Sequence, residues 1–262
     1  MLQHIEPFSR MQSVAEVWSY LSNALTQLGF PFTHYTVTRV LESDSVAMPC
    51  DKITLSNLPH GLIERFRLGD LSQTAPLHRW LNEHGGVSSL ERVFNDWDRG
   101  ALSPREIATL TAFLERGHLA AYGISLHHIA PRHQGTIVLG APVGMTQPEL
   151  DLIWDRHHAQ AIALASLAQM RIASLPFGGG LLPLTQRQRE VLECISAGKS
   201  TAEIAEILKI SAPTVEKHLR LARSTLGVRT TAQAIVLASL RNQIFIAEPR
   251  PLPGEISGSR AA

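Results

Sequence analysis

A chain of 262 residues is long enough for one or two domains with a sizeable core. Its two cysteines, Cys50 and Cys194, exclude a disulfide framework, and no apolar run approaches the ~18 to 20 residues of a membrane span. Because no charged segment followed by an apolar one opens the chain, we expect a cytoplasmic protein that does not contact a membrane.

The net charge of +1 hides an asymmetry along the chain. Residues 184–245 hold nine Lys or Arg against five Asp or Glu, whereas residues 1–183 hold thirteen against sixteen. A modestly basic C-terminal segment suits a DNA phosphate backbone. Because the excess is small, we expect a dimer, which doubles the set of contacts, more than a monomer that binds DNA strongly.

The first third of the chain alternates helical and strand-like patterns. Apolar residues recur at helical spacing from Met11 to Leu28, and Gly29 ends this predicted helix. The β-branched and aromatic residues of Phe32 to Val40 predict a strand. The segments expected next are a short strand around Ile53, a helix at Leu62–Leu68, a turn at Gly69-Asp70, and a helix or loop near Pro76 that ends before Gly85-Gly86.

The middle of the chain completes one predicted domain. Ser103 and Pro104 cap a helix that runs toward Arg116. The elements expected after it are strands at His118–Ile129 and Gly135–Ala141 and a long helix at Gln147–Ala173. This order predicts an α+β fold, an α-β-α sandwich with an antiparallel sheet.

Composition divides the chain into four segments. We expect a first domain at residues 1–173, a glycine-rich linker at 174–183, a second domain at 184–245, and a disordered tail rich in Pro, Gly and Ser at 246–262.

The second domain contains four helix starts. Thr185 with Gln188, Ser200 with Glu203, and Thr230 with Gln233 each fit a capping box, and Ser211 is followed by Pro213 in a first turn. Only Lys209 and Ile210 separate the second helix from the Ser211 cap, a spacing typical of a helix-turn-helix. We therefore expect an all-α domain of four helices in which the helix after Ser211 enters the DNA major groove.

Residue identities in this domain resemble, position by position, the DNA-binding domain of the LuxR family. The residues that carry the resemblance are Leu184-Thr185-x-Arg187, Glu190-Val191-Leu192, Gly198-x-Ser200, Glu203-Ile204-Ala205, Leu208-x-Ile210-Ser211, Thr214-Val215-x-x-His218 and Leu226-Gly227-Val228. The resemblance implies double-stranded DNA as a partner. It implies base reading around Ser211 and Thr214 by Glu216, Lys217 and Arg220, and makes Arg187, Lys199, Arg223 and Arg229 candidate phosphate contacts. On an arbitrary helix the same side chains would be solvated surface charges.

The domain departs from the family pattern at four positions. The family usually has Glu at Gln188, Asn at Leu221, Lys at Thr225 and Arg at Thr231. Gln188 still completes a capping box. The missing Lys and Arg remove expected phosphate contacts and leave the fold unaffected.

The N-terminal domain resembles, in the order of its elements, the autoinducer-binding domain of acyl-homoserine-lactone receptors. In those receptors a Trp and an Asp grip the amide and lactone groups of the ligand. Aligning Pro76 with the family's Asp-Pro step puts Ala75 at the Asp and Leu62 at the Trp. The remaining ligand-binding candidates are Phe66 at the family's Tyr, Leu90 at a second Trp, Gly123 at a family glycine, and Tyr35 and Trp80.

Neither Ala75 nor Leu62 can form a hydrogen bond through its side chain. We therefore expect a regulator that does not bind acyl-homoserine lactones in the usual way. Three alternatives stay open: a different or more apolar small molecule, a domain that mainly dimerises, and control by a heterodimeric partner. Adjacent histidines such as His127-His128 diverge, which disfavours a metal site, and no nucleophile–base pattern or cofactor motif indicates an enzyme.

Overall fold

The computed structural model describes residues 2–39, 52–59, 61–62, 74–130, 133–176 and 184–245. The chain divides into two compact units, Met1–Leu175 and Pro176–Ala262. The predicted helix after Leu62, the Gly69-Asp70 turn, the glycines at 178–180 and the tail after Phe245 lie outside the described residues.

The first unit begins with two helices, α1 (Leu2–Arg10) and α2 (Val14–Gln27), and continues with strands and helices in alternation. Its other described elements are β1 (Phe32–Arg39), β2 (Lys52–Ser56), α5 (Pro76–His84), β3 (Val87–Ser89), α6 (Leu90–Asp98), α7 (Pro104–Leu114), β4 (Ala121–Ser125), β5 (His133–Gly140) and α8 (Gln147–Ser174).

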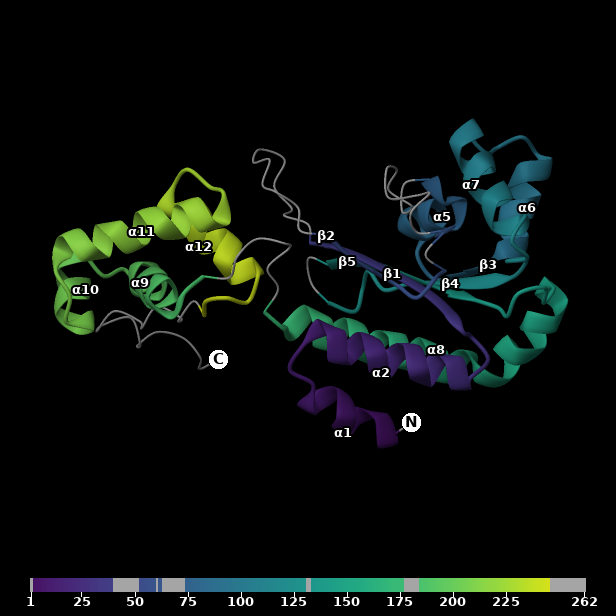
Figure 1. The fold of residues 1–262 in the computed structure, drawn as a ribbon, viewed down its shortest axis with the longest axis horizontal. Coiled ribbons are helices and arrows are strands. Elements are labelled where there is room, and N and C mark those ends of the chain that lie inside the picture. Colours follow the sequence, from purple (N-terminus) through teal and green to yellow (C-terminus); the bar gives the residue numbers. More distant parts are fainter. Residues whose placement is uncertain are drawn as a thin grey trace, which may run out of the picture. The chain divides into compact units, whose positions relative to one another are not determined.

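The strands form one sheet in the order β2-β1-β5-β4-β3, and every neighbouring pair is antiparallel. Figure 1 shows α1, α2 and α8 on one side of this sheet and α5, α6 and α7 on the other. The predicted α+β sandwich with an antiparallel sheet is therefore confirmed.

Alternation along the strands assigns side chains to the two helical layers. On the α8 face, the Tyr35 hydroxyl donates to the Gln169 side-chain oxygen, and the Tyr122 hydroxyl donates to Asp151 at 2.7 Å. On the opposite face, Gly123 lets α5 approach the sheet, because a Cβ at this position would lie 2.5 Å from a methyl of Leu81. The face of the sheet toward α8 is therefore part of a packed core, and the opposite face packs against the layer of α5.

Three elements were not predicted from the sequence: α1, β3 and α6. Pro7 lies inside α1, where proline removes a backbone donor and weakens the helical pattern. Strand β3 has only three residues, too few for an alternation to be recognised.

The second unit consists of four helices in its described part, which confirms the all-α prediction. They are α9 (Gln186–Ser196), α10 (Thr201–Leu208), α11 (Ala212–Leu226) and α12 (Thr231–Leu240). Capping boxes form at Thr185, Ser200 and Thr230, as predicted. Ser211 is the N-cap of α11, but its side chain makes no capping bond to the backbone.

Candidate functional site

The connection between α10 and α11 is a tight turn. Lys209 ends α10 in the left-handed conformation, with φ of 53°, and Ile210 and Ser211 lead into the next helix. Pro213 lies in the first turn of α11, where its missing N–H leaves no bond unmade. This local chemistry produces the helix-turn-helix and determines where α11 begins.

One face of α11 packs into the helical unit and the other is exposed. Val215 and Leu219 are buried, whereas Glu216, Lys217 and Arg220 are exposed. Lys217 and Arg220 form no ion pair or hydrogen bond through their side chains with any other described residue. Glu216 differs, because its carboxylate accepts a hydrogen bond of 3.3 Å from the Thr201 hydroxyl on α10.

The start of α11 has a hydroxyl pair. The Ser211 and Thr214 side-chain oxygens lie 2.8 Å apart, and either can be the donor. Ser211, the N-cap, is exposed, and Thr214 in the first turn of α11 is half-buried.

Three of the four candidate phosphate-binding side chains have partners within the unit. Arg187 pairs with Glu190 at 2.8 Å, and Lys199 lies 3.9 Å from Glu203. Arg223 is half-buried and donates to the Thr231 hydroxyl at 2.9 Å, which links α11 to α12. Arg229 is exposed before α12, and His218 is half-buried on α11.

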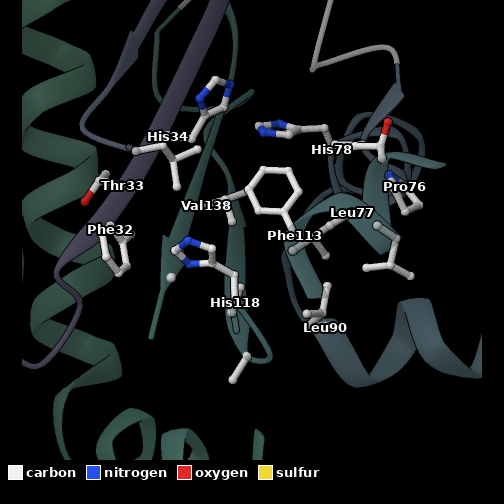
Figure 2. Close-up of a pocket in the computed structure, with 17 residues that line it drawn as sticks. Phe32, Thr33, His34, Pro76, Leu77, His78, Leu90, Phe113, His118 and Val138 are labelled. Atoms are coloured by element: carbon white, nitrogen blue, oxygen red, sulfur yellow. The ribbon is translucent and has the colours of Figure 1, made fainter. Parts of the chain in front are cut away.

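The first unit contains a cavity of about 100 Å³ between the sheet and the layer of α5, α6 and α7. Figure 2 shows that side chains from both layers point into it. Its described lining consists of Phe32, Thr33, His34, Leu58, Ala75, Pro76, Leu77, His78, Leu90, Thr109, Leu110, Phe113, His118, Ala120, Ala121, Val138 and Gly140.

An ion pair and a capping box hold the helical wall of this cavity together. Glu106 is buried and accepts from Arg79 of α5 at 2.6 Å. The same carboxylate completes the capping box of Ser103, which starts α7. Helices α5 and α7 are therefore fixed relative to each other within this wall.

The cavity is largely apolar, and most of its polar side chains have partners inside the protein. His78 Nδ1 lies 2.8 Å from the Thr136 hydroxyl, a hydrogen bond whose donor depends on the tautomer. Thr109 donates to the Arg105 carbonyl at 2.9 Å. The His118 ring and the Thr33 hydroxyl differ, because no other described residue forms a hydrogen bond with either group.

The His118 ring is 9% exposed and lies between two phenylalanines. Its centroid is 4.8 Å from that of Phe32 and 6.0 Å from that of Phe113, both in edge-to-face geometry. Burial lowers the pKa of this imidazole, and the positive charge of Arg116 lowers it further. The ring is therefore held neutral at the cavity wall.

The ligand-binding candidates of the sequence do not all meet at this cavity. Ala75 and Leu90 line it. Leu62 is fully buried and Trp80 half-buried, but neither lines the cavity; Phe66 lies outside the described residues. Tyr35 lies on the α8 face of the sheet, and Gly123 contacts α5.

Sequence reasoning did not single out His34, His78 and His118 as cavity residues. Strand alternation puts His34 on the face opposite Tyr35, but it does not tell which face borders a cavity. Within the described ranges, no three His, Cys, Asp or Glu side chains are arranged to hold a metal ion. No helix in this part of the chain is both long and apolar enough to cross a membrane.

Comparisons with known proteins match both units. Residues 13–172, more than half of the chain, match the autoinducer binding domain family, and residues 182–238 match the luxR family of bacterial regulatory proteins. Over 53 residues the chain is 47% identical to the transcriptional regulatory protein MctR of Rhizobium johnstonii, a match that covers 20% of this chain and 25% of MctR. It is also 47% identical over 53 residues to the spore germination protein GerE of Bacillus subtilis, covering 20% of this chain and 72% of GerE.

A crystal structure of Escherichia coli SdiA has the same fold, with a TM-score of 0.57 and 18% identity over 94% of this chain and 97% of that chain. LuxR-type regulators bind DNA and are not enzymes. The chain belongs to the luxR family of bacterial regulatory proteins and is a DNA-binding transcription regulator with an autoinducer binding domain.

Proposed function

We propose that this regulator reads DNA through Lys217 and Arg220 of α11 and responds to a small molecule in the cavity of residues 1–173. In this proposal the ligand is not an acyl-homoserine lactone held in the usual way. The observation that carries the proposal is the cavity wall, whose described lining contains no carboxylate, tryptophan or tyrosine. Ala75, which the resemblance aligns with the family's Asp, is part of this lining.

Lys217 and Arg220 suit base reading because both are exposed and neither has a side-chain partner among the described residues that it would have to leave. Arg and Lys are complementary to the acceptors of guanine in the major groove, and Glu216 could accept from cytosine. To do so, Glu216 would exchange its bond from Thr201 for a base contact. Arg187 and Lys199 are in exposed ion pairs worth about 0 to 1 kcal/mol, so phosphates can compete for them.

The DNA part of the proposal is tested with Arg220→Ala and an operator selected from random duplexes. The variant should lose about 1 to 3 kcal/mol of binding free energy in a mobility shift, with relaxed preference at one base pair. Arg99→Ala is the matched control, because it removes an exposed arginine from the end of α6. If Arg220→Ala binds the operator as tightly as the wild type, Arg220 does not contact the bases.

The ligand part follows from the cost of unmet hydrogen bonds. An acyl-homoserine lactone buries an amide and two or more carbonyl groups, and each buried group without a partner costs about 1 to 3 kcal/mol. Loss of two such partners would weaken binding by about two to four orders of magnitude, at ~1.4 kcal/mol per tenfold. A cavity of about 100 Å³ also leaves little room for a long acyl chain.

Calorimetry of the full chain with octanoyl-homoserine lactone tests this part. We expect no binding tighter than about 100 μM, because the side chains that would form hydrogen bonds with the amide and lactone groups are missing. Micromolar or tighter binding would contradict the proposal.

Control by a partner chain is the second candidate. Leu152 and Met170 of α8 are 61% and 57% exposed. Eighteen residues make five turns of an α-helix, so both lie on one face of α8, where a second chain could cover them. Native mass spectrometry of protein from its own host distinguishes the candidates: a retained small molecule supports the cavity, and a stoichiometric second regulator supports partner control.

A further inference from the structure

The His118 ring lines the cavity, is more than nine-tenths buried, and has no hydrogen-bond partner among the described residues. The Thr33 hydroxyl also lacks a partner there, but alternation along β1 places Thr33 on the same face as Tyr35, turned away from the cavity. By contrast, His78 and Thr109 have their partners in Thr136 and the Arg105 carbonyl. Buried polar atoms in native proteins are normally paired, so an occupant of the cavity is the natural partner of the His118 imidazole.

The walls around His118 are aromatic. Phe32 and Phe113 meet its ring edge to face, at interplanar angles of 80° and 75°. Across the cavity the rings of His34 and His78 meet in the same way, with centroids 5.1 Å apart (Figure 2). Aromatic rings prefer edge-to-face or offset neighbours, so such walls favour another ring over a flexible chain.

The size of the cavity limits the occupant to about one ring. An apolar cavity of about 150 Å³ is known to hold benzene, whereas pockets for drug-sized ligands start at about 300 Å³. At about 100 Å³, this cavity holds a single small ring after a modest shift of its walls. No lysine or arginine is among the described lining residues, so a charged ligand would be buried without a counter-charge.

We propose that the cavity binds a small neutral phenol, with its ring among Phe32, Phe113 and Val138 and its hydroxyl hydrogen-bonded to His118. The inference rests on the proposed function, because it names the chemical class that the sensing cavity recognises. A neutral imidazole offers one acceptor and one donor nitrogen, and a hydroxyl can both donate and accept. Burial keeps His118 in this neutral form by lowering its pKa.

Phenol and toluene are the matched probes, because they have the same shape and differ only by a hydroxyl in place of a methyl group. In calorimetry of the full chain we expect phenol to bind at least about tenfold tighter than toluene. An apolar cavity without a hydrogen-bonding group would prefer toluene, since burial of an unpaired hydroxyl is costly. Equal binding, a preference for toluene, or no binding of either probe would overturn the inference.

His118→Phe tests the assignment to this residue, since it keeps a ring against Phe32 and Phe113 and removes the nitrogens. The variant should lose the preference for phenol and retain toluene. His84→Phe is the control, because His84 stacks on Trp80 outside the cavity and a phenyl ring preserves that contact. The preference for phenol should survive there. Survival of the preference in His118→Phe would overturn the assignment.

A measurement on the wild-type chain covers the case that His118→Phe does not fold. The imidazole nitrogen resonances of His118 should shift with phenol and stay unchanged with toluene. Failure of this inference can be distinguished from failure of the proposed function. If phenol and toluene bind equally well, only the assignment of a phenol ligand is overturned. If octanoyl-homoserine lactone binds with micromolar affinity, the proposed function itself is overturned.

Discussion

At the scale of single residues, Gly123 shows how closely α5 approaches the sheet. A Cβ at this position would lie 2.5 Å from Leu81 Cδ1 and 3.1 Å from Leu77 Cγ, and Leu81 is fully buried. We expect Gly123→Ala to lower the free energy of unfolding by about 1 to 3 kcal/mol, because overpacking forces buried side chains out of their rotamers. Urea denaturation of the full chain measures this loss.

Gly61→Ala is the matched control for that substitution. A Cβ at Gly61 meets no atom of the described residues within 4 Å, and the backbone there is not left-handed. Its stability should therefore stay within about 0.5 kcal/mol of the wild type. If Gly123→Ala lowers the free energy of unfolding no more than Gly61→Ala does, the close approach of Leu81 does not constrain position 123.

His118 carries a second prediction, which concerns pH. Its pKa in the folded chain is lowered by burial and then by Arg116, whereas the unfolded value is about 6.5. Below that pH the imidazole is protonated in the unfolded chain but stays neutral in the folded chain. The free energy of unfolding therefore falls as the pH falls from about 6.5 toward the folded pKa. The wild type should therefore lose more stability between pH 7.5 and 5.5 than His118→Phe.

The comparison isolates His118 from other groups that respond in the same direction. Burial also lowers the pKa of His127, with His128 as a second cause, and this contribution persists in both proteins. Thermal melting at several pH values gives the two curves. Parallel curves would show that His118 does not couple folding to protonation.

Single residues of the cavity were only partly predictable. The resemblance to autoinducer-binding domains indicated Ala75 and Leu90, and both line the cavity. It could not indicate His118, because the sequence predicted a strand at His118–Ile129, whereas β4 begins at Ala121 and His118 lies in the connection after α7. The helices packed on a sheet decide which face of a strand borders a cavity. Tyr35 faces α8 and its neighbour His34 faces the cavity, a difference that the sequence of the strand does not reveal.

At the scale of elements, helix caps were the most predictable feature. The three capping boxes of the helical unit follow from residues three positions apart, so no distant contact is needed to infer them. Strand β1 was also recognisable from its own residues and begins at Phe32 as predicted. Its pairing with β5, about a hundred residues later, depends on tertiary contacts that local patterns do not contain.

Caps that look alike in sequence should differ in energy. Ser200 forms a full capping box at α10, whereas Ser211 at α11 makes no side-chain bond to the backbone and meets the Thr214 hydroxyl instead. We expect Ser200→Ala to destabilise the helical unit by about 1 kcal/mol and Ser211→Ala by clearly less. Amide hydrogen exchange in α10 and α11 measures both effects.

These two variants serve as each other's control, because the same substitution is made at two N-caps of one unit. A larger loss from Ser211→Ala than from Ser200→Ala would contradict the interpretation. It would mean that the bond between the Ser211 and Thr214 hydroxyls fixes the start of α11.

At the scale of the whole molecule, the sequence indicated an autoinducer-binding-like domain and a DNA-binding domain in one chain, as the family matches confirm. The DNA-binding domain was the more predictable of the two. The helix-turn-helix matches its family through local motifs, so its fold and its exposed face followed from sequence. The first unit needs a sheet whose order, β2-β1-β5-β4-β3, brings distant strands together. Its cavity arises from that order and from the Arg79–Glu106 contact between α5 and α7, which no sequence spacing indicates.

The last prediction concerns the copy number on DNA. Within the described part of the chain, Lys217 and Arg220 are the only exposed cations of α11 without a side-chain partner, on the face that we propose reads bases. Residues 184–245 have a small positive excess. We therefore expect two copies to bind half-sites one helical turn apart, about 34 to 36 Å or 10 to 10.5 base pairs. Insertion of half a turn, about five base pairs, moves one half-site to the other side of the duplex and should weaken binding at least about tenfold. A full-turn insertion should weaken it less, because it restores the relative orientation of the half-sites. Fluorescence anisotropy with the three duplexes measures the series, and equal affinities would mean that each copy binds alone.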